Sequence, residues 1–144
     1  MLKRNSLVFP NGKLVILRIN MFIHSGTGER DYVCSPLCDT TIDSVEAYDE
    51  ECWVTVDPWV SIDVPQGRFV GGDGTMGNEG FIAHTDKQDQ LIWGLFFEQT
   101  NPIKQLFVEG HTLRAVNEHG ELKIVINLQD LTDIHISTMD NCAD

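Results

Sequence analysis

Apolar and polar residues alternate in short runs along the second half of the chain. The runs are residues 80–85, 90–100, 103–109, 112–118, 122–128 and 132–137. Alternation with a period of two is typical of strands with one buried face, and connections of two to five residues join neighbouring antiparallel strands. The pattern therefore predicts an antiparallel meander in the C-terminal half.

One of these runs differs from the others because nearly every residue from Leu91 to Phe97 is apolar. A strand without alternation is expected to have both faces covered, so we place it in the centre of the sheet. In the first half, residues 13–23 and 52–57 have the composition or alternation of strands. Pro58 predicts a bend directly after the second of them.

A single segment, TTIDSVEAYDEEC (40–52), has the spacing of a helix. Thr40, followed three residues later by Asp43, is the predicted N-cap. One helical face is predicted to be apolar, with Ile42, Val45, Tyr48 and Cys52. A second face is acidic, with Asp39, Asp43, Glu46 and Glu50.

These elements predict a β-rich α+β fold. We expect a curled antiparallel sheet or half-barrel, with one short amphipathic helix lying on it. The 144 residues are enough for one domain with a real core, and we expect a single domain over 1–144. A hydrophobic fraction of 42% supports a folded protein rather than a disordered one.

The net charge of −12 is unevenly distributed along the chain. Residues 1–30 carry five Lys or Arg and one acid, whereas residues 31–65 carry nine acids and no Lys or Arg. A field of this sign repels nucleic acid and anionic lipid and attracts cationic proteins. We therefore expect no direct binding to nucleic acid or to a membrane.

The acidic stretch CDTTIDSVEAYDEECW (38–53) has four possible roles: a metal site, a catalytic acid–base pair, a docking surface, or a solvated helix face. A metal site needs ligands that converge on one point, and an acid–base pair needs a carboxyl in an apolar pocket. A row of solvated carboxylates along a helix provides neither converging ligands nor an apolar pocket. Solvated helices usually mix both charge signs, since opposite charges one turn apart are stabilising. Because this stretch has no Lys or Arg, a docking surface is favoured over a merely solvated helix face. Both interpretations remain possible from the sequence.

The glycine-rich stretch VGGDGTMGNEG (70–80) matches the G-x-G-x-x-G spacing of phosphate-binding loops at Gly72, Gly74 and Gly77. Such loops work because a helix follows and its N-terminal amides hold the phosphate. Here a predicted strand follows, and Asp73 adds negative charge. We interpret the stretch as a loop or a bulge-rich turn that can still belong to a binding surface.

No catalytic or metal-binding pattern is recognisable in the chain. The histidines and the four cysteines lack zinc-site spacing, and no nucleophile motif is present. We expect no enzymatic activity, no cofactor and no bound metal. The N-terminal apolar run is broken by Pro10 and Gly12, so we expect a cytoplasmic protein with free thiols. A disulfide from Cys52 to Cys34 or Cys38 is the alternative for an exported chain.

The docking interpretation names a set of partner-binding residues. Trp59, beside the predicted helix, is either a core residue or an exposed anchor of the kind that concentrates binding energy. The full set is Asp39, Asp43, Glu46, Asp49, Glu50, Glu51, Asp57, Trp59 and Asp73. Either the acidic helix or the loop at 71–80 is expected to meet the partner.

The last half of the chain resembles bacterial immunity proteins of polymorphic toxins, including those of contact-dependent growth inhibition. The similar stretches are GFIAHTD (80–86), WGLFF (93–97), NPIK (101–104) and INLQDLTDI (126–134). The resemblance implies a small non-enzymatic protein that neutralises a basic toxin domain, most often a nuclease, as a 1:1 complex. Acidic side chains would occupy the groove that normally receives phosphates.

Two other functions compete with this expectation. The chain could bind a small ligand or nucleotide through the loop at 71–80. It could also be an assembly module that pairs with itself.

Overall fold

The computed structural model describes residues 1–144 except 3, 24, 29, 50 and 140–144. Within the described residues the chain forms eleven strands and one helix. The first strands are β1 (Ser6–Val8), β2 (Lys13–Ile23) and β3 (Arg30–Thr41), followed by the helix α1 (Ile42–Tyr48). The remaining strands are β4 (Asp57–Val64), β5 (Gly67–Asp73), β6 (Gly80–Thr85), β7 (Leu91–Phe97), β8 (Ile103–Glu109), β9 (Thr112–Asn117), β10 (Leu122–Asn127) and β11 (Asp130–Thr138).

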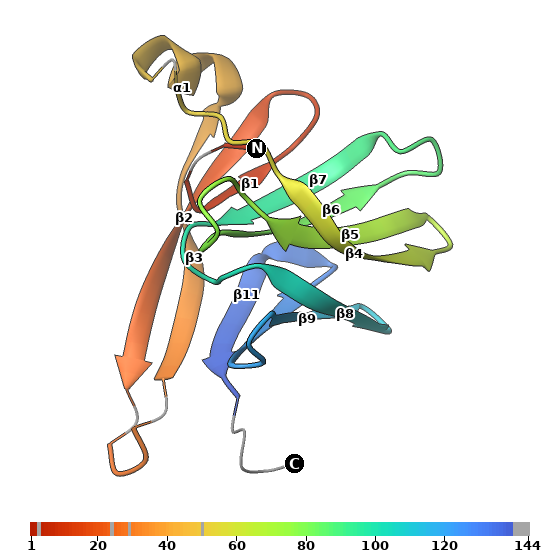
Figure 1. Ribbon diagram of the computed structural model, residues 1–144. Coiled ribbons are helices and arrows are strands. Elements are labelled where there is room, and N and C mark those ends of the chain that lie inside the picture. The colour runs from red at the N-terminus through yellow and green to blue at the C-terminus, as the bar shows by residue number, and fades with distance from the viewer. Residues whose placement is uncertain (3, 24, 29, 50, 140–144) are drawn as a thin grey trace.

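All strands belong to one antiparallel sheet with the order β4-β5-β6-β7-β1-β2-β3-β11-β10-β9-β8. The sheet curls so strongly that its last strand, β8, contacts β4 and β5 near the other end (Figure 1). The predicted β-rich half-barrel with one short helix is therefore confirmed. The strands β6 to β11 follow the predicted runs closely, but they do not form one continuous meander. β8 to β11 pair in succession, whereas β7 pairs with β6 and β1, and β8 lies at the far end of the sheet order, next to β4 and β5 in space.

The main core fills the inside of the curl and receives residues from nearly every strand. Trp93, Leu95 and Phe97 reach it from β7 and are almost fully buried. The other face of β7 is also covered, because Phe96 lies in a separate cluster with Phe81. The prediction of a central strand with two covered faces is confirmed, and the apolar run without alternation is its cause.

The segment from Cys52 to Val56 crosses the outer face of the sheet. Cys52 and Val54 are buried and Trp53 is exposed, as the alternation predicts. The prediction of a strand at 52–57 is nevertheless wrong, since β4 begins only at Asp57. The segment pairs with the N-terminus instead, through a bridge between Leu2 and Trp53 and a hydrogen bond from the Val54 N–H to the Met1 carbonyl (2.7 Å).

Four strands were not predicted: β4, which does alternate at Val60, Ile62 and Val64, and three strands that lack the period-two signal, β1, β3 and β5. β3 contains Pro36 and is exposed along most of its length, so it shows little apolar alternation. β5 includes glycines that the sequence assigned to a loop. Gly72 is required there because a Cβ atom would lie 2.0 Å from the Asp57 carbonyl oxygen of β4. The short β1 joins β2 to β7.

The helix α1 is shorter than predicted, and its N-cap is Thr41, not Thr40. The Thr41 hydroxyl accepts a hydrogen bond from the Ser44 N–H (3.1 Å), while Thr40 stays in β3 opposite Leu14. Ile42 and Val45 pack on the sheet as predicted. Tyr48 does not join them, because the helix ends at this residue and leaves its side chain 92% exposed.

Candidate functional site

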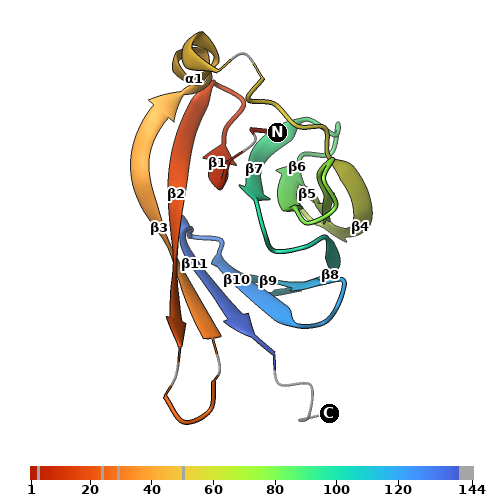
Figure 2. The same ribbon diagram turned by 60° about the vertical axis from the view of Figure 1, so that its left-hand side comes forward.

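The helix α1 lies at the end of the sheet where β3 finishes (Figures 1 and 2). The Ile42 N–H donates to the Gly12 carbonyl (2.8 Å), which holds the helix start against the turn before β2. Ile42 and Val45 contact a buried cluster that contains Leu2 and Leu14. Because these contacts fix the apolar face inward, the polar face of α1 must point to solvent.

Most of the predicted acidic residues are gathered on and around this helix. Asp39, Asp43 and Glu51 are exposed, and none of them forms an ion pair with any residue that the structure describes. Asp49 is half-buried and accepts a hydrogen bond from the Glu51 N–H (3.1 Å). Glu50 lies outside the described residues. Within the described part of the chain, Asp39, Asp43 and Glu51 therefore have no cation as a partner.

Glu46 differs from its neighbours because its carboxylate already has a partner. Its Oε1 accepts a hydrogen bond from Nε1 of Trp53 at 2.7 Å. This contact ties α1 to the segment that crosses the outer face of the sheet. Sequence spacing placed Glu46 among the docking carboxylates, and the structure gives it a positioning contact within the protein.

Replacing Trp53 by phenylalanine is expected to lower the free energy of unfolding by about 1 kcal/mol, because it removes this hydrogen bond while keeping an aromatic ring. Hydrogen exchange should report the loss as faster exchange in α1. Trp59→Phe is the matched control, since Trp59 is 44% exposed and Trp53 is 42% exposed. Equal effects of the two changes on α1 would contradict the role given to this contact.

Exposed aromatic rings stand among the carboxylates. Tyr48 is 92% exposed and Trp53 is 42% exposed, although both are large enough to be core residues. One cation is also close, because Lys13 lies opposite Thr41 in the pairing of β2 with β3. We call the set Asp43, Tyr48, Asp49, Glu51 and Trp53 the α1 surface. Asp39 is left out because it lies opposite Val15 on the core-facing side of the sheet, whereas α1 packs on the other side, with Leu14 and Ile16. Aromatic anchors surrounded by charge are common at protein interfaces.

The other predicted site residues lie on β4 and β5. Trp59 is 44% exposed, which favours an anchor over a core role. Asp57 and Asp73 lie directly opposite each other in the ladder, a destabilising arrangement for two like charges. Oδ1 of Asp73 is buried without a hydrogen-bond partner in the described part of the chain. The structure therefore brings these two carboxylates together, but not on α1.

The glycine-rich stretch is divided between a strand and a turn. Residues 70–73 belong to β5, so their assignment to a loop is wrong, while the segment between β5 and β6 is a turn as predicted. Glu79 is buried under this turn, and its Oε1 accepts the Met76 N–H (2.9 Å). A Cβ atom at Gly74 would lie 2.5 Å from the same Oε1. At Gly74 the glycine thus makes room for a buried carboxylate.

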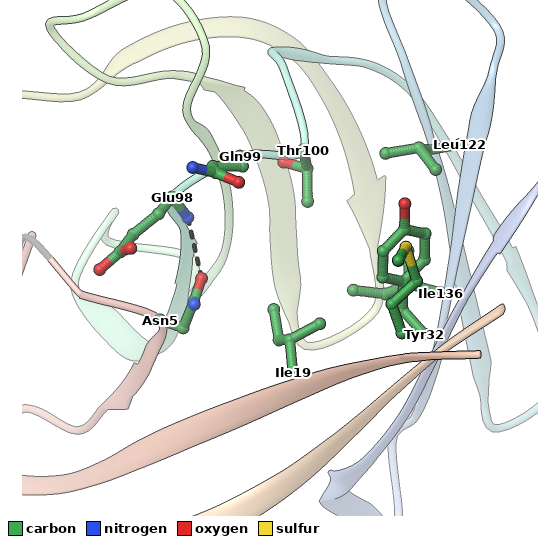
Figure 3. A pocket seen from close by; sticks show the side chains of 9 residues that line it. Asn5, Ile19, Tyr32, Glu98, Gln99, Thr100, Leu122 and Ile136 are labelled. Atoms are coloured by element: carbon green, nitrogen blue, oxygen red, sulfur yellow. Dashed lines mark hydrogen bonds between the residues drawn. The ribbon is translucent and has the colours of Figure 1, made fainter. Parts of the chain in front are cut away.

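A cavity of about 300 Å³ opens beside β2 and was not predicted from the sequence. One wall is mainly apolar and the other polar, and the two face each other across the opening (Figure 3). The lining residues are Asn5, Ile19, Met21, Tyr32, Glu98, Gln99, Thr100, Leu122 and Ile136. They come from segments far apart in the chain, so no local pattern could reveal the cavity.

His84 lies in a row of aromatic rings across β5, β6 and β7. Its ring centroid is 4.5 Å from that of Phe69 and 5.9 Å from that of Trp93. Burial lowers the pKa of His84 below its usual 6.5, and Nε2 has no hydrogen-bond partner among the described residues. The folded protein therefore resists protonation of this side chain more than the unfolded chain does.

This difference predicts a pH-dependent stability. Below pH 6.5 the unfolded chain binds a proton that folded His84 does not, so acidification should favour unfolding by at most about 1.4 kcal/mol per pH unit. The loss should begin as the pH falls through 6.5 and stop below the lowered pKa of the folded state. Urea unfolding between pH 7.5 and 5.5 should show it in the native protein and not in His84→Phe. Identical pH profiles would contradict this assignment.

The three described cysteines are not arranged for a disulfide or a zinc site. Cys34 and Cys52 are buried, Cys38 is exposed, and all three are free, as predicted; Cys142 lies outside the described residues. Burial raises the pKa of Cys34 to about 12, which makes this thiol unreactive. Over the described ranges, no group of three His, Cys, Asp or Glu side chains is placed to hold a metal.

None of the described segments is a helix long and apolar enough to span a membrane. Comparisons with protein-family models, with curated proteins and with solved structures give no match to this chain.

Proposed function

We propose that the chain is a non-enzymatic immunity protein that binds and neutralises a cationic toxin domain, with the α1 surface as its docking site. The observation that carries the proposal is a pair of exposed carboxylates, Asp43 and Glu51, which have no ion pair among the described residues and flank in sequence the 92% exposed Tyr48. The resemblance of the C-terminal half to immunity proteins supports the same function. The proposed toxin is a nuclease, because its groove for nucleic acid is basic.

The proposed mechanism is occlusion. Complementary charge speeds the encounter of the two proteins, and desolvated aromatic contacts then slow their separation. The carboxylates of the α1 surface take the positions of substrate phosphates in the toxin groove. Neutralisation follows from a 1:1 complex in which the nucleic acid is excluded, and no bond is made or broken.

The test starts from the gene next to the one for this chain. Under the proposal, it encodes a large secreted protein that ends in a basic domain. That domain should degrade RNA or DNA, and an equimolar amount of this chain should stop the degradation. If the neighbouring gene encodes no such domain, or if the domain keeps its full activity with excess chain, the proposal fails.

A further inference from the structure

β1 ends early and leaves part of β2 without a neighbour. β1 pairs only with Leu14, Val15 and Ile16, and the Leu17 N–H donates to the Asn5 carbonyl (2.9 Å) one step further. β2 continues to Ile23, well past the end of this pairing. Figures 1 and 2 show this half of β2 extending beyond β1 as one arm of a long hairpin with β3.

The direction of the backbone groups along this edge follows from the bonds nearby. The Lys13 carbonyl and the Leu17 N–H both form hydrogen bonds toward β1. The backbone N–H and C=O groups of the odd-numbered residues of β2 therefore point to the β1 side. Facing directions alternate along a strand, so the N–H and C=O groups of Ile19, Met21 and Ile23 point to the open edge. No described residue forms a hydrogen bond with this edge.

The open edge lies beside the cavity of about 300 Å³. The side chains of Ile19 and Met21 form part of the apolar wall, together with Tyr32 from β3. Figure 3 shows the opposite wall, where Asn5 and the segment 98–100 continue the line of β1 and β7. We call the open edge and this cavity the β2 slot. It occupies the place that a longer β1 would have filled.

The exposed edge lacks the features that normally prevent strands from pairing with other chains. Natural edge strands carry lysine, proline or a bulge. The stretch INMFI (19–23) has no charge and no proline, and the irregularity of β2 lies earlier, at Ile16 and Leu17. Met21, Phe22 and Ile23 are 50%, 54% and 61% exposed. Such an edge favours addition of a strand.

We infer that the β2 slot binds an extended segment of a cationic protein partner by β-strand addition. Residues opposite Ile19, Met21 and Ile23 would bond to their backbone groups and place apolar side chains over the cavity. The intervening residues would be Lys or Arg, because this chain has a net charge of −12 and Glu98 is exposed at the rim. The same charge disfavours a second copy of this chain. Only the positive charge of the partner rests on the proposed function; the strand pairing rests on the geometry.

The experiment uses the acetylated peptide Lys-Val-Lys-Val-Lys-Val-Lys and a copy with N-methyl groups on its three valines. The methyl groups remove the donors that would face β2 and leave the charge unchanged. In an NMR titration of the full chain, the first peptide should shift the amide signals of Ile19, Met21 and Ile23. The methylated copy should bind at least tenfold more weakly. Equal binding of the two peptides, or shifts confined to α1, would overturn the inference.

Two matched variants test the same point on the protein. Met21→Lys places a cation on the cavity side of β2, and Phe22→Lys places one on the opposite face at nearly equal exposure (50% and 54%). Peptide binding should fall at least tenfold in Met21→Lys and stay within twofold in Phe22→Lys. Equal losses of peptide binding in the two variants would show that net charge alone causes the effect, and this would overturn the inference. Self-association of the chain that Met21→Lys abolishes would also overturn it, since the occupant would be a second copy.

Failure of the β2 slot and failure of the proposed function give different results. If the valine methyl groups have no effect, the slot fails while the α1 surface can still bind the toxin domain. If Asp43→Lys/Glu51→Lys leaves toxin binding unchanged, the α1 surface fails while peptide binding to the slot is untouched.

Discussion

Replacing Phe97 by alanine is expected to lower the free energy of unfolding by about 3–5 kcal/mol. Phe97 is fully buried on the central strand β7 and belongs to the cluster that fills the inside of the curled sheet. The substitution removes most of a ring and leaves a cavity that the neighbouring strands cannot close. Small domains are stable by about 5–15 kcal/mol, so the variant should lose a large part of its stability.

Urea unfolding of Phe97→Ala and Phe107→Ala measures this effect against a matched control. Phe107 is 53% exposed on β8, so its replacement should change the free energy of unfolding by about 0.5 kcal/mol or less. Similar losses in the two variants would contradict the assignment of the core to the inside of the curl.

Reversing two charges of the α1 surface, with Asp43→Lys/Glu51→Lys, is expected to weaken toxin binding by about 10- to 100-fold, mostly through slower association. Both carboxylates are exposed and free of ion pairs within the described part of the chain, so no internal contact is lost. Lysine in the first turn of α1 opposes the helix dipole, at a cost of about 0.3–1 kcal/mol. The fold should therefore remain intact.

The matched control is Asp63→Lys/Glu109→Lys, which makes the same change in net charge. Their side chains are 84% and 82% exposed, and their ion pairs with Arg68 and Arg114 are exposed and contribute little. Stopped-flow association should show a small decrease for the control, and the difference between the variants should shrink as salt is added. Equal decreases would mean that net charge, not the α1 surface, governs binding.

The strands β6 to β11 were predictable because each of them carries its own signal. Short connections predict that consecutive strands pair, which holds for β6 with β7 and for β8 to β11 but not for β7 with β8. The unbroken apolar run of β7 indicates its central position. β3 and β5 carry no such signal. β3 is mostly exposed. The glycines of β5 are needed because a side chain there would clash with Asp57 or Ile103, which lie elsewhere in the sequence.

The candidate site was predictable only in part. Helical spacing placed Asp39, Asp43, Glu46 and Glu50 on one acidic face; Asp43 and Glu46 are exposed on α1, but Asp39 lies in β3, before the helix begins. Spacing could not show that Trp53 folds back to bond Glu46, or that α1 ends at Tyr48. The β2 slot has no local signal at all, because it depends on where β1 stops.

We propose that the α1 surface meets a cationic toxin domain. Hydrogen exchange of the chain, alone and with the basic domain encoded by the neighbouring gene, tests it most directly. Exchange should become slower on binding in α1 and in the adjoining residues 51–53. Binding that leaves exchange in these residues unchanged would contradict the proposal.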